Sequence, residues 1–259
     1  MSSINERFQF ATGLIRRAGD HALNYFQSID TLHIRTKGPQ DMVSDADVQT
    51  ELLIRDALKA EFPEDAFLGE ETGREEIGRR EGIWVVDPID GTQPFINGMS
   101  CWCVSIAFVL NGVLEFGFVY SPARNELFAG GRNAAATLND QPIRVKKSPD
   151  LATGMVGVGY SLRVPFSDFV PVFSRLLERG GMFYREGSGA LTLCYVACGR
   201  LIGYVEVHIN SWDCLGALAV VQAAGGEYND FLADGGLWKG NWLVAGAPEV
   251  YPVLRDLLS

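Results

Sequence analysis

The spacing of hydrophobic residues at the start of the chain predicts a helix, a strand and a second helix. Residues 4–27 place apolar side chains three or four positions apart, as an amphipathic helix does. A short strand is expected over 32–36. Ser44 is a favourable N-cap for a second helix that runs to about Glu61, and Pro63 ends it.

Short apolar runs come next and predict a sheet. Residues 66–69 form a brief strand that ends at Glu70-Glu71, and residues 83–86 form a buried strand that leads into a run of polar residues. From Val104 to Leu138 the pattern predicts a meander of strands. Its turns are expected at Asn111-Gly112, Ser121-Pro122, Gly130-Gly131 and Asn139-Asp140.

From about Met155 onward, the pattern changes to strands that alternate with helices. Helices are expected over 167–179, 188–198, 212–224 and 248–258, and strands near 204–207 and 242–244. The fold class expected is α+β or α/β, a layered αβαβα sandwich. Residues 1–145 would form an N-terminal subdomain with an antiparallel sheet and helices, and 146–259 a smaller C-terminal α/β subdomain.

Composition and charge narrow the function. The chain has 259 residues, of which 47% are hydrophobic, and a formal net charge of −10. That charge argues against direct nucleic-acid binding and against an anionic membrane as partner, because both require a basic face. The longest apolar run, Cys101 to Tyr120, is broken by Asn111-Gly112 and predicts two strands rather than a membrane span.

Two further signals concern cellular location and metal type. The first residues lack the basic and apolar segments of a signal peptide, so we expect a cytoplasmic protein. The five cysteines include no C-x-x-C pair, and the three histidines are scattered. Buried, reduced thiols explain these cysteines better than a zinc site does.

Carboxylates at strand ends are the strongest chemical signal. Asp87 and Asp90 lie three positions apart directly after a hydrophobic strand, and Pro88 restricts the turn between them. Gly91 allows a ligand to approach the backbone closely. Both carboxylates can therefore face one point, together with the carbonyl of Ile89.

Further acids show the same pattern. Glu70 and Glu71 come directly after a strand, and Asp213 lies at the apparent start of a helix. Such oxygen donors suit Mg²⁺ or Mn²⁺, and carboxylates shared between two ions recur in phosphoryl transfer. Taken singly, each acid is more typical of a turn, a solvated surface or a helix cap than of a metal site.

Three motifs in order identify a family resemblance. They are Gly69-Glu70-Glu71, Trp84-Val85-Val86-Asp87-Pro88-Ile89-Asp90-Gly91-Thr92 and Trp212-Asp213. Three further stretches agree, namely Asp41 to Asp47, Gly187-Ser188-Gly189-Ala190-Leu191 and Ala224-Gly225-Gly226. Over nearly its whole length the chain resembles the inositol monophosphatase family, within the lithium-sensitive phosphatase superfamily.

The resemblance implies two to three Mg²⁺ ions per subunit, with Mn²⁺ as an alternative. Glu70, Asp87 and the Ile89 carbonyl would hold the first ion, and Asp87, Asp90 and Asp213 the second. Glu70 would also touch a third ion that has Asp47 in its outer shell. Thr92 with Glu70 would orient the attacking water, and the amides of Gly91 and Thr92 would hold phosphate. The reaction expected is in-line attack of metal-activated water, without a phosphoenzyme.

The resemblance also implies a substrate and a partner. Glu206 would bind polyol hydroxyls beside Asp90 and Asp213, Gly187 and Gly189 would border the pocket, and Arg185 would lie at its rim or at a subunit interface. Inositol 1-phosphate is the leading substrate. The chain departs from the family pattern at Gln93-Pro94-Phe95-Ile96-Asn97-Gly98, Ser44 and Gly189.

Because of these departures, histidinol phosphate or a broad range of sugar phosphates are alternative substrates. A regulatory binding protein linked to RNA metabolism is an alternative of another class. The family also suggests inhibition by Li⁺ and a homodimer, for which the N-terminal helix and the 104–120 strands are candidate interface elements.

Overall fold

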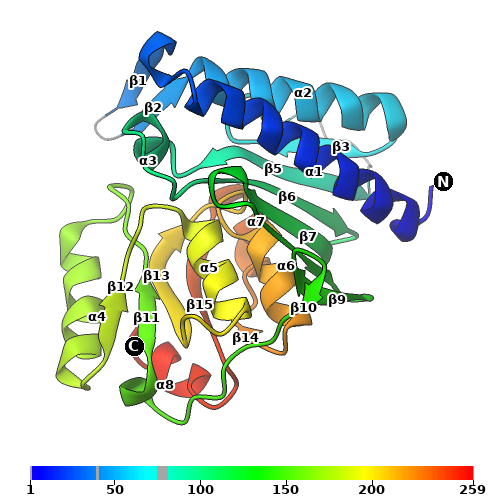
Figure 1. The fold of residues 1–259 in the computed structure, drawn as a ribbon. Coiled ribbons are helices and arrows are strands. Elements are labelled where there is room, and N and C mark those ends of the chain that lie inside the picture. Colours follow the sequence, from blue (N-terminus) through cyan, green and yellow to red (C-terminus); the bar gives the residue numbers. More distant parts are fainter. Residues whose placement is uncertain (1, 39–40, 75–80, 259) are drawn as a thin grey trace.

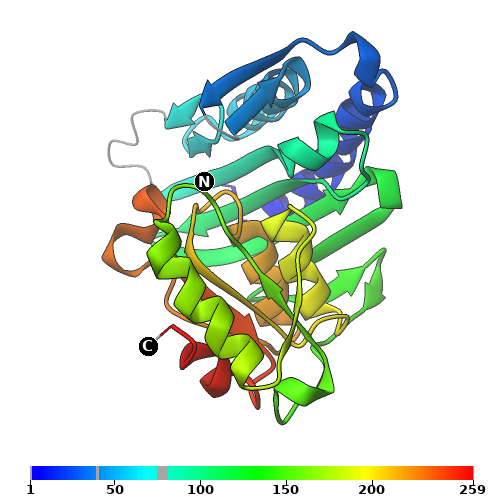
Figure 2. The same cartoon turned by 90° about the vertical axis from the view of Figure 1, so that its left-hand side faces the viewer.

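The described residues, 2–38, 41–74 and 81–258 of a computed structural model, form five stacked layers. Helices α1 (Ile4–Phe26) and α2 (Asp45–Glu61) cover one face of an eight-stranded sheet, and α5 (Gly189–Ala197) and α6 (Leu215–Ala223) cover the other. The same two inner helices contact a five-stranded sheet, whose far face packs against α4 (Phe166–Glu178) and α8 (Tyr251–Arg255). Both views show this order of layers (Figure 1; Figure 2). The predicted αβαβα sandwich is confirmed.

The large sheet has the strand order β10-β9-β8-β7-β6-β5-β3-β4. Only β3 and β5 pair in parallel, and the other neighbours are antiparallel. The bounds are β3 Ala66–Gly69, β4 Gly73–Arg74, β5 Gly82–Asp90, β6 Cys103–Leu110, β7 Val113–Ser121, β8 Glu126–Gly131, β9 Ala134–Leu138 and β10 Gln141–Pro142. The expected meander is β6 to β9. The turn predicted at Gly130-Gly131 lies at Arg132-Asn133 instead, because β8 includes both glycines.

The smaller sheet has the order β12-β11-β13-β15-β14. Strands β12, β11 and β13 run parallel, whereas β15 pairs antiparallel with β13 and β14. The bounds are β11 Met155–Val158, β12 Met182–Tyr184, β13 Gly203–Ile209, β14 Glu227–Tyr228 and β15 Asn241–Gly246. Short helices α3 (Thr92–Ile96) and α7 (Gly236–Lys239) were not expected from the sequence.

Alternating side chains explain why both sheets are covered on two faces. Along β5, Trp84 packs in the core under α1 and α2, whereas Val85 packs in the core under α5 and α6. On β13, Tyr204 packs in the core under α5 and α6, whereas Val205 packs in the core under α4 and α8. Strands buried on both faces read as continuous apolar runs, which is the pattern seen in the sequence.

The apolar face of α1 is buried inside the chain. Ser3 and Glu6 form a capping box, and the buried face of α1 lies on β6 and β7. Because α6 covers the other face of these strands, most side chains of residues 104–120 are buried within the chain, and their part in a homodimer interface stays a prediction. The side chains of that stretch are needed for the core of the single chain.

Several boundaries differ from the sequence prediction. The strand expected over 32–36 is β1 (Ile34–Gly38), which pairs with β2 (Asp41–Ser44) in a hairpin that the pattern did not indicate. The last predicted helix is shorter, since α8 spans five residues. Residues 39–40, between β1 and β2, lie outside the described residues. The division at residue 145 stays a prediction, and one core cluster includes residues from both sides of it.

No helix in the described ranges is both long and apolar enough to cross a membrane.

Candidate functional site

The turn after β5 carries the first two predicted ligands. The pairing of β5 with β6 shifts register between Asp87 and Asp90, so the strand bulges at this segment. The Ile89 amide donates to Asp87 Oδ1 at 3.0 Å, which holds the carboxylate against its own turn. Gly91 then has φ 94°, and a Cβ there would lie 2.8 Å from the Cys101 carbonyl oxygen. Only glycine fits both the conformation and the space.

Two other segments bring acids to the same place. Because β3 pairs in parallel with β5, Glu70 follows β3 beside the end of β5, and its amide donates to the Val86 carbonyl at 3.3 Å. Asp213 lies in the turn before α6, not in the helix as the sequence indicated, and its Oδ2 accepts from the Asn210 amide at 3.3 Å. Ligand atoms of Glu70, Asp87 and Asp213 all lie within 4.8 Å of one another.

The pKa of each of these three carboxylates is raised, and for Glu70 and Asp87 the neighbouring acids contribute. Loss of hydration is the main cause, and the neighbouring negative charges add to it: Asp213 acts on Glu70, and Glu70 acts on Asp87. The pKa of Asp213 is also raised by loss of hydration, against the opposing effect of Arg163. A cluster of hard oxygen donors under mutual repulsion fits a divalent cation such as Mg²⁺, which removes the repulsion.

Asp90 faces a different partner from the other three acids. Its Oδ2 accepts from the Ser188 hydroxyl at 2.6 Å and from the Ala190 amide at 2.7 Å, and its Oδ1 accepts from the Gly189 amide at 3.4 Å. Burial and Asp213 raise its pKa to about 7. Asp90 thus joins the end of β5 to the start of α5. Its role as a ligand of a second ion stays a prediction.

Ser188 is the N-cap of α5, at the start of the helix expected over 188–198. Its hydroxyl accepts from the Leu191 amide at 3.1 Å while it donates to Asp90.

Asp47 and Thr92 meet behind the cluster. The Thr92 hydroxyl lies 3.3 Å from Asp47 Oδ1 and 3.2 Å from the Ile89 carbonyl oxygen. Asp47 Oδ2 accepts from both the amide and the hydroxyl of Ser44, in the capping box of α2. The start of α2 and the start of α3 are therefore linked through Thr92, which the family resemblance assigns to orienting water, and Asp47, which it places in the outer shell of a third ion.

Glu51 is a site-forming residue that the sequence analysis missed. It is fully buried on α2, and its two carboxylate oxygens accept from the amides of Glu71 at 2.9 Å and Thr72 at 2.7 Å. A Cβ on Gly69 would lie 2.5 Å from this carboxylate. Glu51 thus clamps the turn that presents Glu70. A charged residue within an amphipathic helix gives no sequence signal for such a role.

Glu206 lies on β13 next to the cluster. It is buried and accepts from the Tyr204 hydroxyl at 2.6 Å. Burial raises its pKa to about 8, although the hydrogen bond from Tyr204 opposes the shift. The hydrogen-bonded pair of Tyr204 and Glu206 fits only because residue 159 is a glycine, since a Cβ at that position would lie 2.2 Å from Glu206 Oε2.

A cavity of about 860 Å³ connects most of the predicted residues. Those that line it are Glu70, Asp90, Gly91, Thr92, Gly187, Gly189, Glu206 and Asp213, with Arg185 as well. Asp87 and Ile89 are buried at its base, and Asp47 is buried beside Thr92. Arg163, which the sequence analysis did not consider, also lines the cavity. Only its place in the folded chain reveals it.

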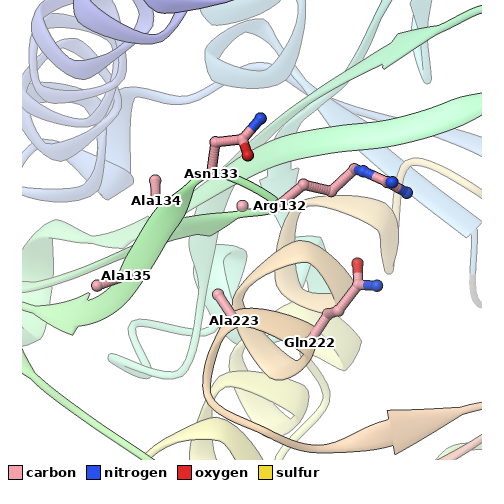
Figure 3. A pocket seen from close by; sticks show the side chains of 7 residues that line it. Arg132, Asn133, Ala134, Ala135, Gln222 and Ala223 are labelled. Atoms are coloured by element: carbon pink, nitrogen blue, oxygen red, sulfur yellow. The ribbon is translucent and has the colours of Figure 1, made fainter.

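A second hollow of about 540 Å³ lies elsewhere. Figure 3 shows Arg132 and Asn133 at the turn between β8 and β9, next to Gln222 and Ala223 at the end of α6. None of the residues that line it is a carboxylate, so it does not offer the donor set of the larger cavity.

Comparison with known proteins decides the family. The model of the inositol monophosphatase family matches residues 4–255. The chain belongs to the inositol monophosphatase family. It is 38% identical to the Nus factor SuhB of Xylella fastidiosa over 218 residues, which cover 83% of this chain and 78% of that protein. It is 34% identical to the Nus factor SuhB of Pasteurella multocida, with 99% of this chain and 96% of that protein covered.

Solved structures agree with this membership. The extragenic suppressor protein suhB of Bartonella henselae superposes with a TM-score of 0.89 at 28% identity, covering 97% of each chain. The inositol monophosphatase of Anabaena superposes with a TM-score of 0.84 at 27% identity, covering 99% of this chain and 96% of that one. The recognition made from the Asp87–Thr92 motif and its companions is therefore confirmed.

Proposed function

We propose that this family member is a Mg²⁺-dependent phosphomonoesterase that acts on a small polyol phosphate, with inositol 1-phosphate as the leading substrate. The observation that carries the proposal is the meeting of Glu70, Asp87 and Asp213 within 4.8 Å, from three distant segments. Such a cluster is unfavourable without a cation, so a family scaffold that retains it retains the means to bind one.

Each residue of the site has a defined task in this proposal. Bound Mg²⁺ would supply positive charge to activate water and to neutralise the phosphate. Glu70, Asp87 and the Ile89 carbonyl would hold the first ion, and Asp87, Asp90 and Asp213 would hold the second. The Thr92 hydroxyl, fixed between Asp47 and Ile89, orients the attacking water. Manganese is the alternative metal.

The alcohol portion of the substrate lies on the side of the phosphate away from the cation and the attacking water. The amides of Gly91 and Thr92 hold phosphate oxygens, and the buried Glu206 receives hydrogen bonds from polyol hydroxyls. Gly187 and Gly189 keep the cavity wall free of side chains at this point. Histidinol phosphate and other sugar phosphates fit the same arrangement and are the alternative substrates.

The test is phosphate release from inositol 1-phosphate with and without Mg²⁺. We expect Asp87→Asn and Asp213→Asn to lower kcat at least about a hundredfold, because each removes a charged ligand. Asp256→Asn, which changes an exposed acid of the C-terminal segment, is the matched control and retains full activity. Circular dichroism confirms that each variant is folded. Near-normal turnover in either ligand variant would refute the assignment.

A second candidate function comes from the names of the relatives. Several are called Nus factor SuhB, which favours a regulatory role for this chain through a bound partner. The net charge of −10 argues that such a partner is not bare nucleic acid. Capture of one stable partner, together with no phosphate release from any polyol phosphate, would favour this role over catalysis.

The homodimer, the sensitivity to Li⁺ and the cytoplasmic location remain proposals. For the homodimer, the structure leaves exposed apolar side chains on α4 and β12. They include Phe166, Leu177, Met182 and Phe183. This surface is the interface to test, since the apolar face of α1 is already buried.

A further inference from the structure

The cavity extends beyond the cation cluster and the phosphate. Its volume of about 860 Å³ lies in the upper range for pockets that hold drug-sized ligands. Outside the acids, one wall consists of the loop 159–165 after β11, and an adjacent wall consists of residues 185–189 before α5. Each of these walls contributes one arginine to the cavity, Arg163 from the loop and Arg185 from the adjacent wall.

Arg163 points toward the alcohol side of the cavity. Its Nη2 lies 3.3 Å from Asp213 Oδ2, and its charge also acts on Glu206. Val164 next to it is buried, and its amide donates to the Ser161 carbonyl at 3.2 Å, so the loop holds its shape behind the arginine. The Arg163 side chain is nevertheless 49% exposed, so the contact with Asp213 does not enclose it.

Arg185 stands on the adjacent wall. Its Nη2 donates to the Tyr160 carbonyl at 3.3 Å, which joins its segment to the loop that carries Arg163. The neighbouring acid does not neutralise it, because Glu186 is paired with Arg124 at 2.9 Å and accepts from the Tyr184 hydroxyl at 2.8 Å. Within the described ranges, no carboxylate lies within 4.0 Å of the Arg185 guanidinium.

We infer that Arg163 and Arg185 recognise a second anionic group on the alcohol of the substrate, a carboxylate or a phosphate. This inference rests on the proposed function and narrows its substrate class. A neutral polyol needs hydroxyl acceptors, which Glu206 supplies. It offers no ionic partner to Arg185 or to the part of Arg163 that is not turned toward Asp213. Guanidinium forks bind carboxylate and phosphate with paired, charge-assisted hydrogen bonds.

The arrangement gives the two anions of one substrate separate walls of the cavity, and Arg163 lies between them because it also contacts Asp213. The phosphate that is cleaved lies at Glu70, Asp87 and Asp213, and the uncleaved anion lies against the arginines. The hydroxyls between them face Glu206. Arg163 and Arg185 therefore determine specificity, and they take no part in breaking the ester bond.

The experiment uses matched pairs of phosphate esters at saturating Mg²⁺. Glucitol 6-phosphate and 6-phosphogluconate differ by a hydroxymethyl group against a carboxylate. Fructose 1-phosphate and fructose 1,6-bisphosphate differ by the second phosphate. The kcat/KM ratio within each pair is measured for the wild type, Arg163→Gln and Arg185→Gln. Arg132→Gln, which changes the exposed arginine of the second hollow (Figure 3), is the control.

We expect the wild type to favour the second-anion member of at least one pair by about tenfold, the size of a charge-assisted contact at a half-exposed site. Each cavity variant should lose most of that preference through a higher KM, and the control should keep it. The pair that responds tells whether the anion is a carboxylate or a phosphate. A perturbed cation site would change both members of a pair alike and leave the ratio unaltered.

Phosphate release without any preference for the second anion would overturn the inference and leave the proposed function standing. The same conclusion would follow if the kcat/KM ratio within each pair were equal in the wild type and the two cavity variants. Absence of Mg²⁺-dependent release from all four esters would refute the proposed function itself, and the inference with it.

Discussion

The clamp formed by Glu51 offers a sharp test of how the site is built. Glu51→Gln keeps the shape of the side chain but replaces one acceptor oxygen with an NH₂ group. Both oxygens accept backbone amides, from Glu71 at 2.9 Å and Thr72 at 2.7 Å, in a fully buried position. One hydrogen bond to a charged group is lost and one amide is left unpaired, which costs about 2 to 3 kcal/mol.

For a chain of this size, that loss corresponds to a fall in Tm of about 4 to 12 °C. We also expect the Mg²⁺ concentration for half-maximal phosphate release to rise about tenfold, because the turn that presents Glu70 is no longer fixed. Thermal unfolding monitored by circular dichroism and an Mg²⁺ titration of activity measure the two effects. Glu61→Gln, an exposed acid on the same helix, is the control.

The two readouts separate two explanations. A lower Tm with an unchanged Mg²⁺ requirement would show that Glu51 stabilises the fold without positioning Glu70. Unchanged values for both would refute the clamp altogether. Gly69→Ala should reproduce both effects, since its Cβ would lie 2.5 Å from the Glu51 carboxylate and must displace it.

Other contacts of the site and the surface lead to three further predictions. Ser188→Ala removes the 2.6 Å hydrogen bond to Asp90, so kcat should fall at least about tenfold with Tm lowered by only a few degrees; an unchanged kcat would show that Asp90 needs no such support. In EDTA, the folded state holds Asp90 with a pKa of about 7 and Glu206 with one of about 8, both above the unfolded values. The folded state therefore binds more protons, and the free energy of unfolding should decrease as pH rises from about 4 to about 8; urea unfolding that shows the opposite slope would contradict this. Phe183→Lys should convert the proposed homodimer to a monomer in light scattering, whereas a dimer that persists would place the interface elsewhere.

The elements that depend on neighbouring residues were predictable from the sequence. The cap at Ser44, the end of α2 before Pro63 and the cap at Ser188 all rest on contacts within a few positions, and the structure has each of them. The buried strands were also readable, because both faces of each sheet are covered. The β1–β2 hairpin was missed because β1 is largely exposed and gives no apolar alternation.

The details of the site depend on contacts between distant segments. The motif at Asp87 and Asp90 suggested that both acids face one point, yet Asp90 is held by the start of α5, about a hundred positions away. Glu51 and Arg163 carry no sequence signal, since a charged residue on a helix or loop is usually solvated. Only the pairing of β3 with β5 and the packing of α2 give Glu51 its role.

The central claim is that Glu70, Asp87 and Asp213 together bind a divalent cation next to a phosphate. Anomalous diffraction from a crystal soaked in Mn²⁺ and inorganic phosphate tests it most directly. We predict that each of the three residues has a carboxylate oxygen about 2.1 to 2.3 Å from a manganese peak, with Asp87 shared where two peaks occur, and with phosphate density near the amides of Gly91 and Thr92. A crystal that binds Mn²⁺ only at other positions, or that leaves these three acids without a peak, would contradict the account.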